Sequence, residues 1–277
     1  MRIHSDWGDW LPREIEDAEP DGVDVWYLGC NGFVLKAADG TTLFIDPYLG
    51  TGDPPRTVRM IPVPFEPQAV AAADAILVSH EHVDHVHGPT QAPIIAGTGA
   101  TYYGPDASIA VTNEARWVER WDLDTDRFVT IAEGDAFDVG ALRINVEPAH
   151  DPDAVHPVSY IIESEAGTFL HAGDSKPADR LASIGKQYDI DLGCLAFGST
   201  GQIPDSETGE PGLTKWYADE DGVIDLANQF QVDRLLPSHH DMWKGMTADP
   251  TGLFDHARRR SYPKRIEIVE IGDRVSV

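Results

Sequence analysis

The sequence predicts a mixed α/β fold in which sheets pack against each other and helices lie outside them. Three observations support this class. Short apolar stretches of strand length recur along the chain, with turn residues between them. Segments with helical periodicity are interleaved with these stretches. The hydrophobic content of 42% is sufficient for a substantial core.

The predicted elements follow in chain order. Residues 1–21 are polar and acidic, and we expect an irregular N-terminal arm there. We expect strands at residues 23–28, 33–37, 42–45, 75–78, 128–131, 142–146, 159–162, 168–171, 190–197, 232–237 and 265–271. We expect helices at residues 67–73, 105–121, 221–230 and 251–260. The chain shows neither a linker nor a short-period repeat, which predicts a single domain over residues 1–277.

The strand at residues 75–78 leads into a loop that is dense in metal-binding side chains. Four candidates lie within six residues: His80, His82, Asp84 and His85. Imidazole and carboxylate groups bind zinc, manganese and iron, and such ligands are often found on loops that a strand holds in place. The spacing of His80 and His82 lets both rings reach one ion, and Asp84 and His85 could hold a second. We therefore predict a metal site here instead of a solvated surface loop.

Three other predicted strands are followed by residues of ligand type. They supply His150, Asp174 and the pair His239 and His240. His156 is an alternative to His150. Each residue alone would more often be a structural hydrogen-bonding group. Together with the first cluster, they indicate strand ends that converge on one rim.

The order of these motifs resembles the metallo-β-lactamase superfamily. Within it, the chain is similar to the manganese-dependent L-ascorbate-6-phosphate lactonase family. The similar stretches are residues 26–32, 50–52, 79–85, 173–175, 188–191, 238–243 and 248–250. The more specific mark is the run His239-His240-Asp241-Met242-Trp243 followed by Asp249-Pro250.

The resemblance implies a four-layer αββα sandwich with the metal site at one edge of its two sheets. It also implies two ligand sets and a bridging carboxylate: His80, His82 and His150 for one ion, Asp84, His85 and His239 for the other, and Asp174 between them. His240 would then contact either a metal ligand or the substrate. Asp46 would orient a ligand histidine, as metal-bound imidazoles usually require. The expected cofactor is one or two divalent ions, manganese or zinc.

A divalent ion lowers the pKa of bound water to about 7, so that hydroxide is available as a nucleophile at neutral pH. We therefore predict a metallo-hydrolase that opens a lactone, or cleaves a similar ester, of a small polar substrate with or without a phosphate group. Asp84 or Asp174 could accept the proton of the attacking water. The side chains that could contact an anionic substrate in the pocket are Arg56, Arg59, Lys176, Lys244 and Trp243.

Three other functions are compatible with the same residues. A phosphodiesterase would use the same metals, and a single iron would favour an oxidoreductase. A metal-stabilised binding module without turnover would need no open coordination position. Bound manganese or zinc would favour hydrolysis over oxidation.

The formal net charge of −26 indicates a strongly acidic surface. It argues against a nucleic-acid partner and against an anionic membrane surface. The N-terminus lacks the apolar region of a signal peptide, and Cys30 and Cys194 are best explained as reduced core residues. We therefore expect a cytoplasmic protein with a small-molecule substrate, and the sequence leaves a homo-oligomer open. Self-repulsion at this charge also predicts a halophilic protein that needs salt for stability.

Overall fold

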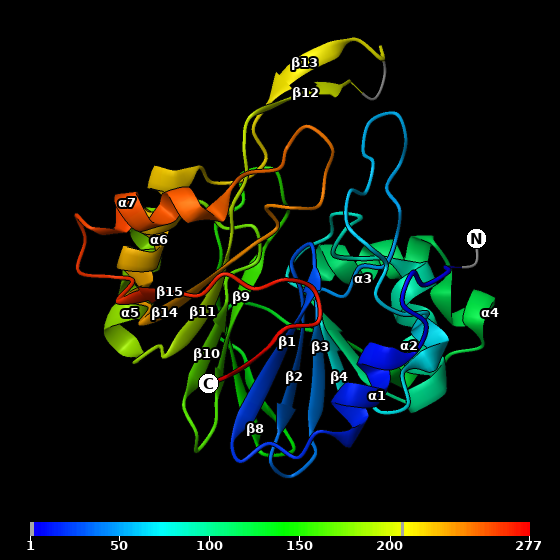
Figure 1. Ribbon diagram of the computed structural model, residues 1–277. Helices are drawn as coiled ribbons and strands as arrows, with labels where there is room; N and C mark the ends of the chain where they lie inside the picture. Colours follow the sequence, from blue (N-terminus) through cyan, green and yellow to red (C-terminus); the bar gives the residue numbers. More distant parts are fainter. Residues whose placement is uncertain (1–2, 206–207) are drawn as a thin grey trace.

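The computed structural model describes residues 3–205 and 208–277. Two seven-stranded sheets lie face to face, and helices cover the outer side of each sheet (Figure 1). The helices α1 to α4 flank the first sheet, and α5 to α7 flank the second. The predicted α/β class and the αββα sandwich are therefore confirmed.

The first sheet has the strand order β16-β1-β2-β3-β4-β5-β6. Its strands are β1 Val23–Gly29, β2 Gly32–Ala37, β3 Thr42–Ile45, β4 Ala75–Leu77, β5 Thr101–Gly104, β6 Phe128–Thr130 and β16 Arg274–Ser276. The strands β1, β2 and β3 form the expected antiparallel meander, whereas β3 to β6 pair in parallel. Parallel pairing places the ends of β3 and β4 at the same edge.

The second sheet has the order β15-β14-β11-β10-β9-β8-β7. Its strands are β7 Ala136–Val139, β8 Leu142–Pro148, β9 Val158–Glu163, β10 Thr168–His171, β11 Leu192–Ala196, β14 Arg234–Ser238 and β15 Arg265–Ile266. The strands β10, β11 and β14 are parallel and end at one edge. A separate hairpin of β12 Gly201–Pro204 and β13 Pro211–Thr214 extends away from the body of the sandwich (Figure 1).

The helices are α1 Trp10–Asp17, α2 Gly88–Thr98, α3 Asp106–Glu114, α4 Trp117–Trp121, α5 Ile184–Gln187, α6 Glu220–Phe230 and α7 Leu253–Ala257. Short 3-10 helices cover Pro67–Ala69, Thr125–Arg127, Asp179–Ser183 and Pro250–Gly252. The helix expected at residues 105–121 is divided in two because Arg116 has a left-handed φ of 56°. None of the helices within residues 3–205 and 208–277 is long and apolar enough to cross a membrane.

The N-terminal segment differs from the prediction of an irregular arm. The helix α1 covers Trp10–Asp17, and Leu11 and Ile15, one turn apart, are buried in the cluster that the first sheet forms with its helices. Lys36 Nζ donates to the carbonyl oxygens of Ile15 and Glu16 at the end of this helix. The polar composition concealed a helix with a narrow apolar face.

Successive side chains of a strand enter different apolar clusters. Val25 and Tyr27 of β1 pack between the two sheets. Trp26 and Leu28, on the opposite face of the same strand, pack with the helices. Because both faces of the sheets are covered, these strands appear in the sequence as continuous apolar runs.

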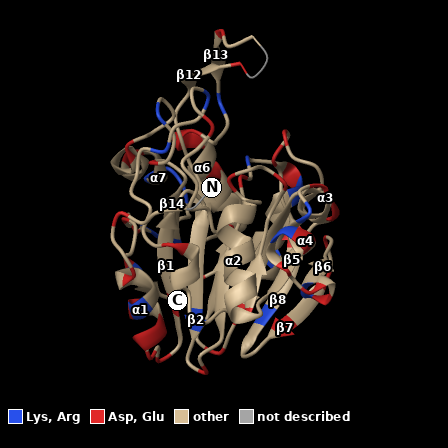
Figure 2. Cartoon of the chain, turned by 90° about the vertical axis from the view of Figure 1, so that its right-hand side faces the viewer, with Lys and Arg blue, Asp and Glu red and all other residues tan. Residues whose placement is uncertain are grey.

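Acidic side chains are distributed over the helices and loops of the whole fold (Figure 2). Their 47 carboxylates outnumber 21 Lys and Arg residues, so mutual repulsion opposes folding. We expect the urea midpoint of unfolding to rise between low salt and about 1 M KCl, where the Debye length falls to about 3 Å. A parallel series with sucrose is the control. Sucrose is also excluded from the protein surface but does not screen charges, so it separates charge screening from the general stabilising effect of an excluded solute. An unchanged midpoint in KCl would contradict a halophilic protein.

Candidate metal centre

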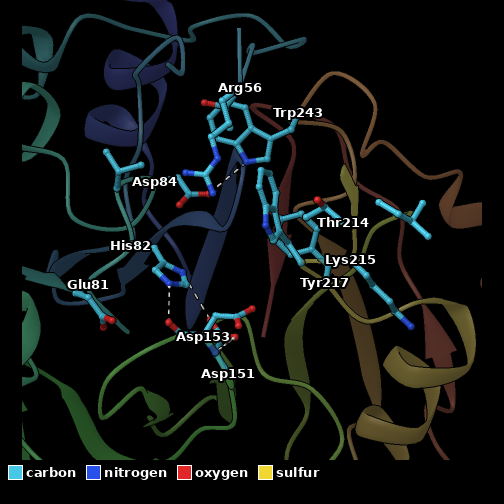
Figure 3. A pocket seen from close by; sticks show the side chains of 14 residues that line it. Arg56, Glu81, His82, Asp84, Asp151, Asp153, Thr214, Lys215, Tyr217 and Trp243 are labelled. Carbon is cyan, nitrogen blue, oxygen red and sulfur yellow. Dashed lines mark hydrogen bonds and ion pairs between the residues drawn. The ribbon is translucent and has the colours of Figure 1, made fainter. Parts of the chain in front are cut away.

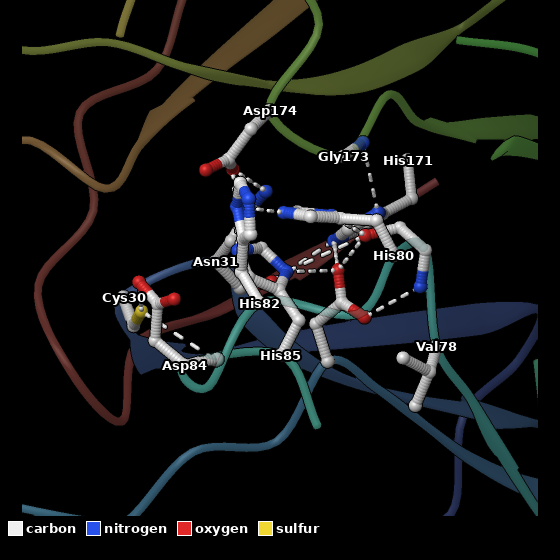
Figure 4. A network of polar contacts seen from close by, with 12 residues as sticks. Cys30, Asn31, Val78, His80, His82, Asp84, His85, His171, Gly173 and Asp174 are labelled. Atoms are coloured by element: carbon white, nitrogen blue, oxygen red, sulfur yellow. Dashed lines mark hydrogen bonds and ion pairs between the residues drawn. The ribbon is translucent and has the colours of Figure 1, made fainter. Parts of the chain in front are cut away.

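Ligand-type side chains of both sheets meet at one edge of the sandwich (Figure 4). The first sheet contributes the loop after β4, residues 79–88. The second contributes Asp174 after β10 and His239 after β14. These strands are parallel to their neighbours, and ligands commonly bind beyond the carboxyl ends of such strands. The prediction that separate strand ends converge on one rim is confirmed.

Within the described chain, three groups of side chains place their ligand atoms within 4.8 Å of one another. The groups are His80 with His82 and Asp151, His80 with His85 and Asp174, and Cys30 with Asp84 and His239. All the predicted ligands except His150 belong to these groups. Two members, Cys30 and Asp151, were not predicted as ligands.

Asp174 lies between the two histidines that the prediction assigns to the second ion. Its Oδ1 is 3.4 Å from His85 Nε2, and its Oδ2 is 3.7 Å from His239 Nε2. Asn31 Nδ2 donates to Oδ1 over 3.1 Å and fixes the carboxylate. This placement suits a carboxylate that bridges two ions.

Asp46 contacts the side of the His85 ring that faces away from the other ligand-type residues. Its Oδ2 accepts from His85 Nδ1 at 2.7 Å and from Ser79 Oγ at 2.5 Å, and its Oδ1 accepts from Ser79 N at 2.8 Å. Burial raises the pKa of Asp46, but attraction to His85 outweighs burial and lowers this pKa below its usual value. Asp46 therefore fixes the ring of His85 through Nδ1, and its role in orienting a metal ligand stays a prediction.

His85 provides a direct indication that the centre accepts a cation. Its Nδ1 is used by Asp46, while its buried Nε2 faces Asp174 and makes no hydrogen bond within the described residues. Burial lowers the pKa of His85, but Asp174 and Asp46 outweigh burial and raise it well above its usual value. The two carboxylates therefore favour positive charge at this point, which a divalent ion can supply.

The other protonation states also suit a divalent ion. Burial and the neighbouring His85 lower the pKa of His80 to about 3, so its imidazole is neutral. Burial raises the pKa of Asp174, but His85 and His239 outweigh it and hold this pKa well below its usual range. Burial likewise raises the pKa of Asp84, but the hydrogen bond with His239 outweighs burial and lowers this pKa below its usual value. Neutral imidazoles and ionised carboxylates are the forms that bind metals.

The residue after β8 that faces the other ligands is Asp151. Its Oδ2 is 3.8 Å from His80 Nε2 and 3.6 Å from His82 Nδ1. The half-buried His150 belongs to none of the three groups. Its backbone is bound to Ser175 Oγ and Lys176 N, directly after Asp174. The assignment of His150 as a ligand therefore stays a prediction, with Asp151 as the residue that the geometry favours.

Of the two roles predicted for His240, the structure does not favour the substrate contact. Its ring packs beside Phe197, with 6.1 Å between ring centroids, and it does not line the cavity described below. The backbone turns here, because β14 ends at Ser238 and His239 has a left-handed φ of 65°. His239 faces Asp84 and Asp174, whereas His240 faces Phe197.

A cavity of about 760 Å³ lies against the metal groups (Figure 3). His82 and Asp84 belong to its lining. Trp243 lines it as predicted, and Trp243 Nε1 donates to Asp84 Oδ2 over 3.3 Å. Tyr217, which the sequence analysis missed, lines the cavity and packs on the His239 ring with 4.1 Å between centroids. A cavity of this size accommodates a small molecule.

Two cationic side chains line the same cavity. Arg56 was predicted, and its guanidinium carbon lies 5.8 Å from the centroid of the Trp216 ring. Lys215, which follows β13, was not predicted, and its Nζ lies 2.5 Å from Asp219 Oδ2. Both residues come from segments that lie outside the two large sheets.

Two other predicted cations have different roles. Arg59 donates to four backbone carbonyl oxygens and so stabilises its own loop: those of Tyr48, Gly50, Ile61 and Pro62. Lys176 Nζ lies 3.3 Å from Asp151 Oδ1 and 3.6 Å from Asp153 Oδ2. Neither residue lines the cavity. The donors of Arg59 are used within the protein, and the acidic partners of Lys176, Asp151 and Asp153, line the cavity in its place. A substrate contact by Arg59 or Lys176 stays a prediction.

Known proteins share both the sequence pattern and the fold. A probable L-ascorbate-6-phosphate lactonase UlaG from Salmonella heidelberg (strain SL476) is 26% identical over 290 residues, which cover 88% of this chain and 77% of the relative. The metallo hydrolase Igni18 from Ignicoccus hospitalis superposes with a TM-score of 0.65 at 18% identity, over 91% of this chain and 97% of that chain. An isothiocyanate hydrolase from Delia radicum gut bacteria gives a TM-score of 0.66 at 15% identity, over 92% and 99% of the two chains.

These structural neighbours share the fold, and the relatives are named as a lactonase and as hydrolases, which agrees with the predicted metallo-hydrolase. The family described as the beta-lactamase superfamily domain matches residues 41–240. The match covers most of the chain and includes all three ligand groups except Cys30. The resemblance predicted from the motifs is confirmed, and the chain belongs to the beta-lactamase superfamily domain family.

Proposed function

We propose that the protein is a metal-dependent hydrolase that opens a lactone, or cleaves a similar ester, of a small anionic substrate. The observation that carries this proposal is the cavity of about 760 Å³ with ligand-type residues on one side and Arg56 and Lys215 on its lining. The relative named as a probable lactonase supports the choice of ester. The acidic surface supports a small substrate, because a nucleic acid would be repelled.

The ligand residues would hold one or two divalent ions, for which we propose manganese or zinc. When bound, such an ion lowers the pKa of a coordinated water and polarises the carbonyl group under attack. The chain itself places the neutral imidazole of His80 and the ionised carboxylate of Asp174 at fixed positions before any ion or substrate arrives. A site that is organised in advance does not have to rearrange as charge develops in the reaction.

Asp84 is the better placed of the two predicted proton acceptors. It lines the cavity, and its lowered pKa keeps it ionised at neutral pH. Both carboxylate oxygens of Asp174 already contact other side chains, those of Asn31, His85 and His239. Asp84 would therefore accept a water proton, and Asp174 would hold the metal together with His85 and His239.

The test combines metal analysis with a substrate screen. The purified protein is analysed for bound metals and then assayed with phosphorylated lactones, neutral lactones and small phosphodiesters, with His82→Ala as the control. Hydrolysis of lactones that His82→Ala abolishes supports the proposal. Preferential cleavage of phosphodiesters would replace it with a phosphodiesterase, and rates equal to those of His82→Ala would remove the proposed centre.

Arg56 is expected to bind the anionic group of the substrate. The substitution Arg56→Met should raise KM for a phosphorylated lactone about 10–100-fold, since a charge-assisted hydrogen bond contributes about 1.5–3 kcal/mol. The kcat should change little, because the group is distant from the reacting carbonyl. Steady-state kinetics with phosphorylated and neutral lactones measure the difference, and Arg116→Met, at an exposed position, is the control. An equal rise in KM for both substrates would contradict this role.

A further inference from the structure

Cys30 is a free, buried cysteine in an apolar cluster with Tyr217 and Trp243, as its sequence context suggests, and it also lies among metal-binding groups. It occupies the turn between β1 and β2 and is fully buried. Its Sγ is 3.5 Å from His239 Nε2 and 3.8 Å from Asp84 Oδ2, and these two atoms are 3.2 Å apart. Thiolate, imidazole and carboxylate are three ligand types that a single zinc ion accepts.

The distances agree with the edges of a tetrahedral site. Zinc binds sulfur at about 2.3 Å and nitrogen or oxygen at about 2.0–2.2 Å, so two donors at a tetrahedral angle are about 3.4–3.6 Å apart. The three observed distances, from 3.2 to 3.8 Å, lie close to this spacing. The group also adjoins the rest of the centre, because Asp174 Oδ2 is 3.7 Å from His239 Nε2.

The other cysteine, Cys194, provides a comparison for Cys30 within the same chain. Cys194 in β11 is equally buried, but it packs between the two sheets and belongs to none of the three ligand groups among the described residues. Cys30 instead has its backbone oxygen bound by His239 N at 2.7 Å and by Tyr27 Oη at 3.0 Å. In the adjoining group, the buried His85 Nε2 makes no hydrogen bond within the described residues and faces Asp174 Oδ1 at 3.4 Å, so this region also favours positive charge.

We propose that Cys30 is a thiolate ligand of the second metal position, together with Asp84 and His239. The inference rests on the proposed metal-dependent hydrolase and specifies its second ion. On binding, the S–H bond breaks, a sulfur–metal bond forms, and the proton leaves to solvent. Because thiolates favour zinc whereas manganese prefers oxygen ligands, this position selects zinc over manganese.

The experiment uses X-ray absorption of the full-length protein loaded with zinc. The wild type should show a sulfur neighbour at about 2.3 Å from zinc. The substitutions Cys30→Ser and Cys30→Ala should remove this neighbour, and Cys194→Ser should keep it. With cobalt in place of zinc, a sulfur-to-cobalt absorption band in the near ultraviolet should follow the same pattern. Cys30→Ser should weaken zinc binding at this position at least about tenfold, since even loss of a ligand's outer partner has an effect of this size.

The outcomes separate this inference from the proposed function. Absence of a sulfur neighbour in the zinc-loaded wild type, or its persistence in Cys30→Ser, overturns the role of Cys30 whether or not the variants fold equally well. Lactone hydrolysis measured on the same samples reports on the function. Hydrolysis without zinc–sulfur contact would overturn only this inference, and zinc–sulfur contact without hydrolysis would overturn only the function.

Discussion

Asp174→Asn is expected to lower kcat/KM by on the order of 10³-fold, because a lost metal contact removes several kcal/mol and each 1.4 kcal/mol or so is tenfold. Asparagine has the shape of aspartate but lacks the negative charge that lies 3.4 Å from His85 Nε2 and 3.7 Å from His239 Nε2. The two ligand groups would then lose the carboxylate that connects them. Metal content and steady-state kinetics of the purified variant measure the effect.

The control for this substitution is Asp255→Asn. Asp255 is exposed on α7 and belongs to none of the three ligand groups, and its substitution changes the net charge by the same amount. Its metal content and kinetics should equal those of the wild type. An Asp174→Asn variant with wild-type metal content and rate would show that the carboxylate does not bridge ions.

Asp46→Asn is expected to reduce metal affinity by about 10–100-fold, the usual effect of losing an outer partner of a metal-binding histidine. Both carboxylate oxygens of Asp46 accept hydrogen bonds, from Ser79 on one side and from Ser79 and His85 on the other. An amide must turn its NH₂ group toward one of these donors. If the NH₂ group faces His85, the ring of His85 loses the acceptor that fixes it. The buried donor left without an acceptor lowers the free energy of unfolding by about 1–3 kcal/mol.

Chelator competition measures the affinity, and urea unfolding without metal measures stability. Asp39→Asn is the matched control, because Asp39 accepts a backbone hydrogen bond from Thr41 in an exposed turn between β2 and β3. An unchanged chelator midpoint in Asp46→Asn would show that His85 needs no partner to hold a metal.

The fold was predictable where burial is reflected in the sequence. Strands that are covered on both faces appear as apolar runs, which is why most strands of the two sheets were expected. The helix α2, Gly88–Thr98, was missed because it contains Pro93 and two glycines, Gly88 and Gly97, which disfavour helix formation. Ile94 and Ile95 are buried with the first sheet, and this tertiary packing outweighs the local preference.

The site was predictable where the ligands share one local pattern. The spacing within residues 80–85 and the ligand-type residues at strand ends identified most of the centre. Asp151 was missed because it adjoins a histidine, and which of the two faces the centre depends on the backbone turn after β8. Cys30 was missed because its partners, Asp84 and His239, are distant in sequence and approach it only through the sheet topology.

The cationic contacts depended on loop conformation, which the sequence pattern does not determine. Arg59 and Arg56 lie in one loop, yet Arg59 donates to backbone carbonyl oxygens while Arg56 lines the cavity. Lys215 reaches the same cavity from the end of β13, about 160 positions along the chain, and only the folded arrangement brings it there.

The cavity has a floor and walls of different origin. Its floor, with His82 and Asp84, is fixed by strands that the whole core holds in place. Its walls come from the loop of residues 50–62 and from the segment that follows the β12–β13 hairpin, which lies outside both large sheets (Figure 1). Surface segments tolerate changes of length and sequence that a sheet does not. A descendant of this protein could therefore acquire a new substrate by remodelling the walls alone and inherit its reaction unaltered.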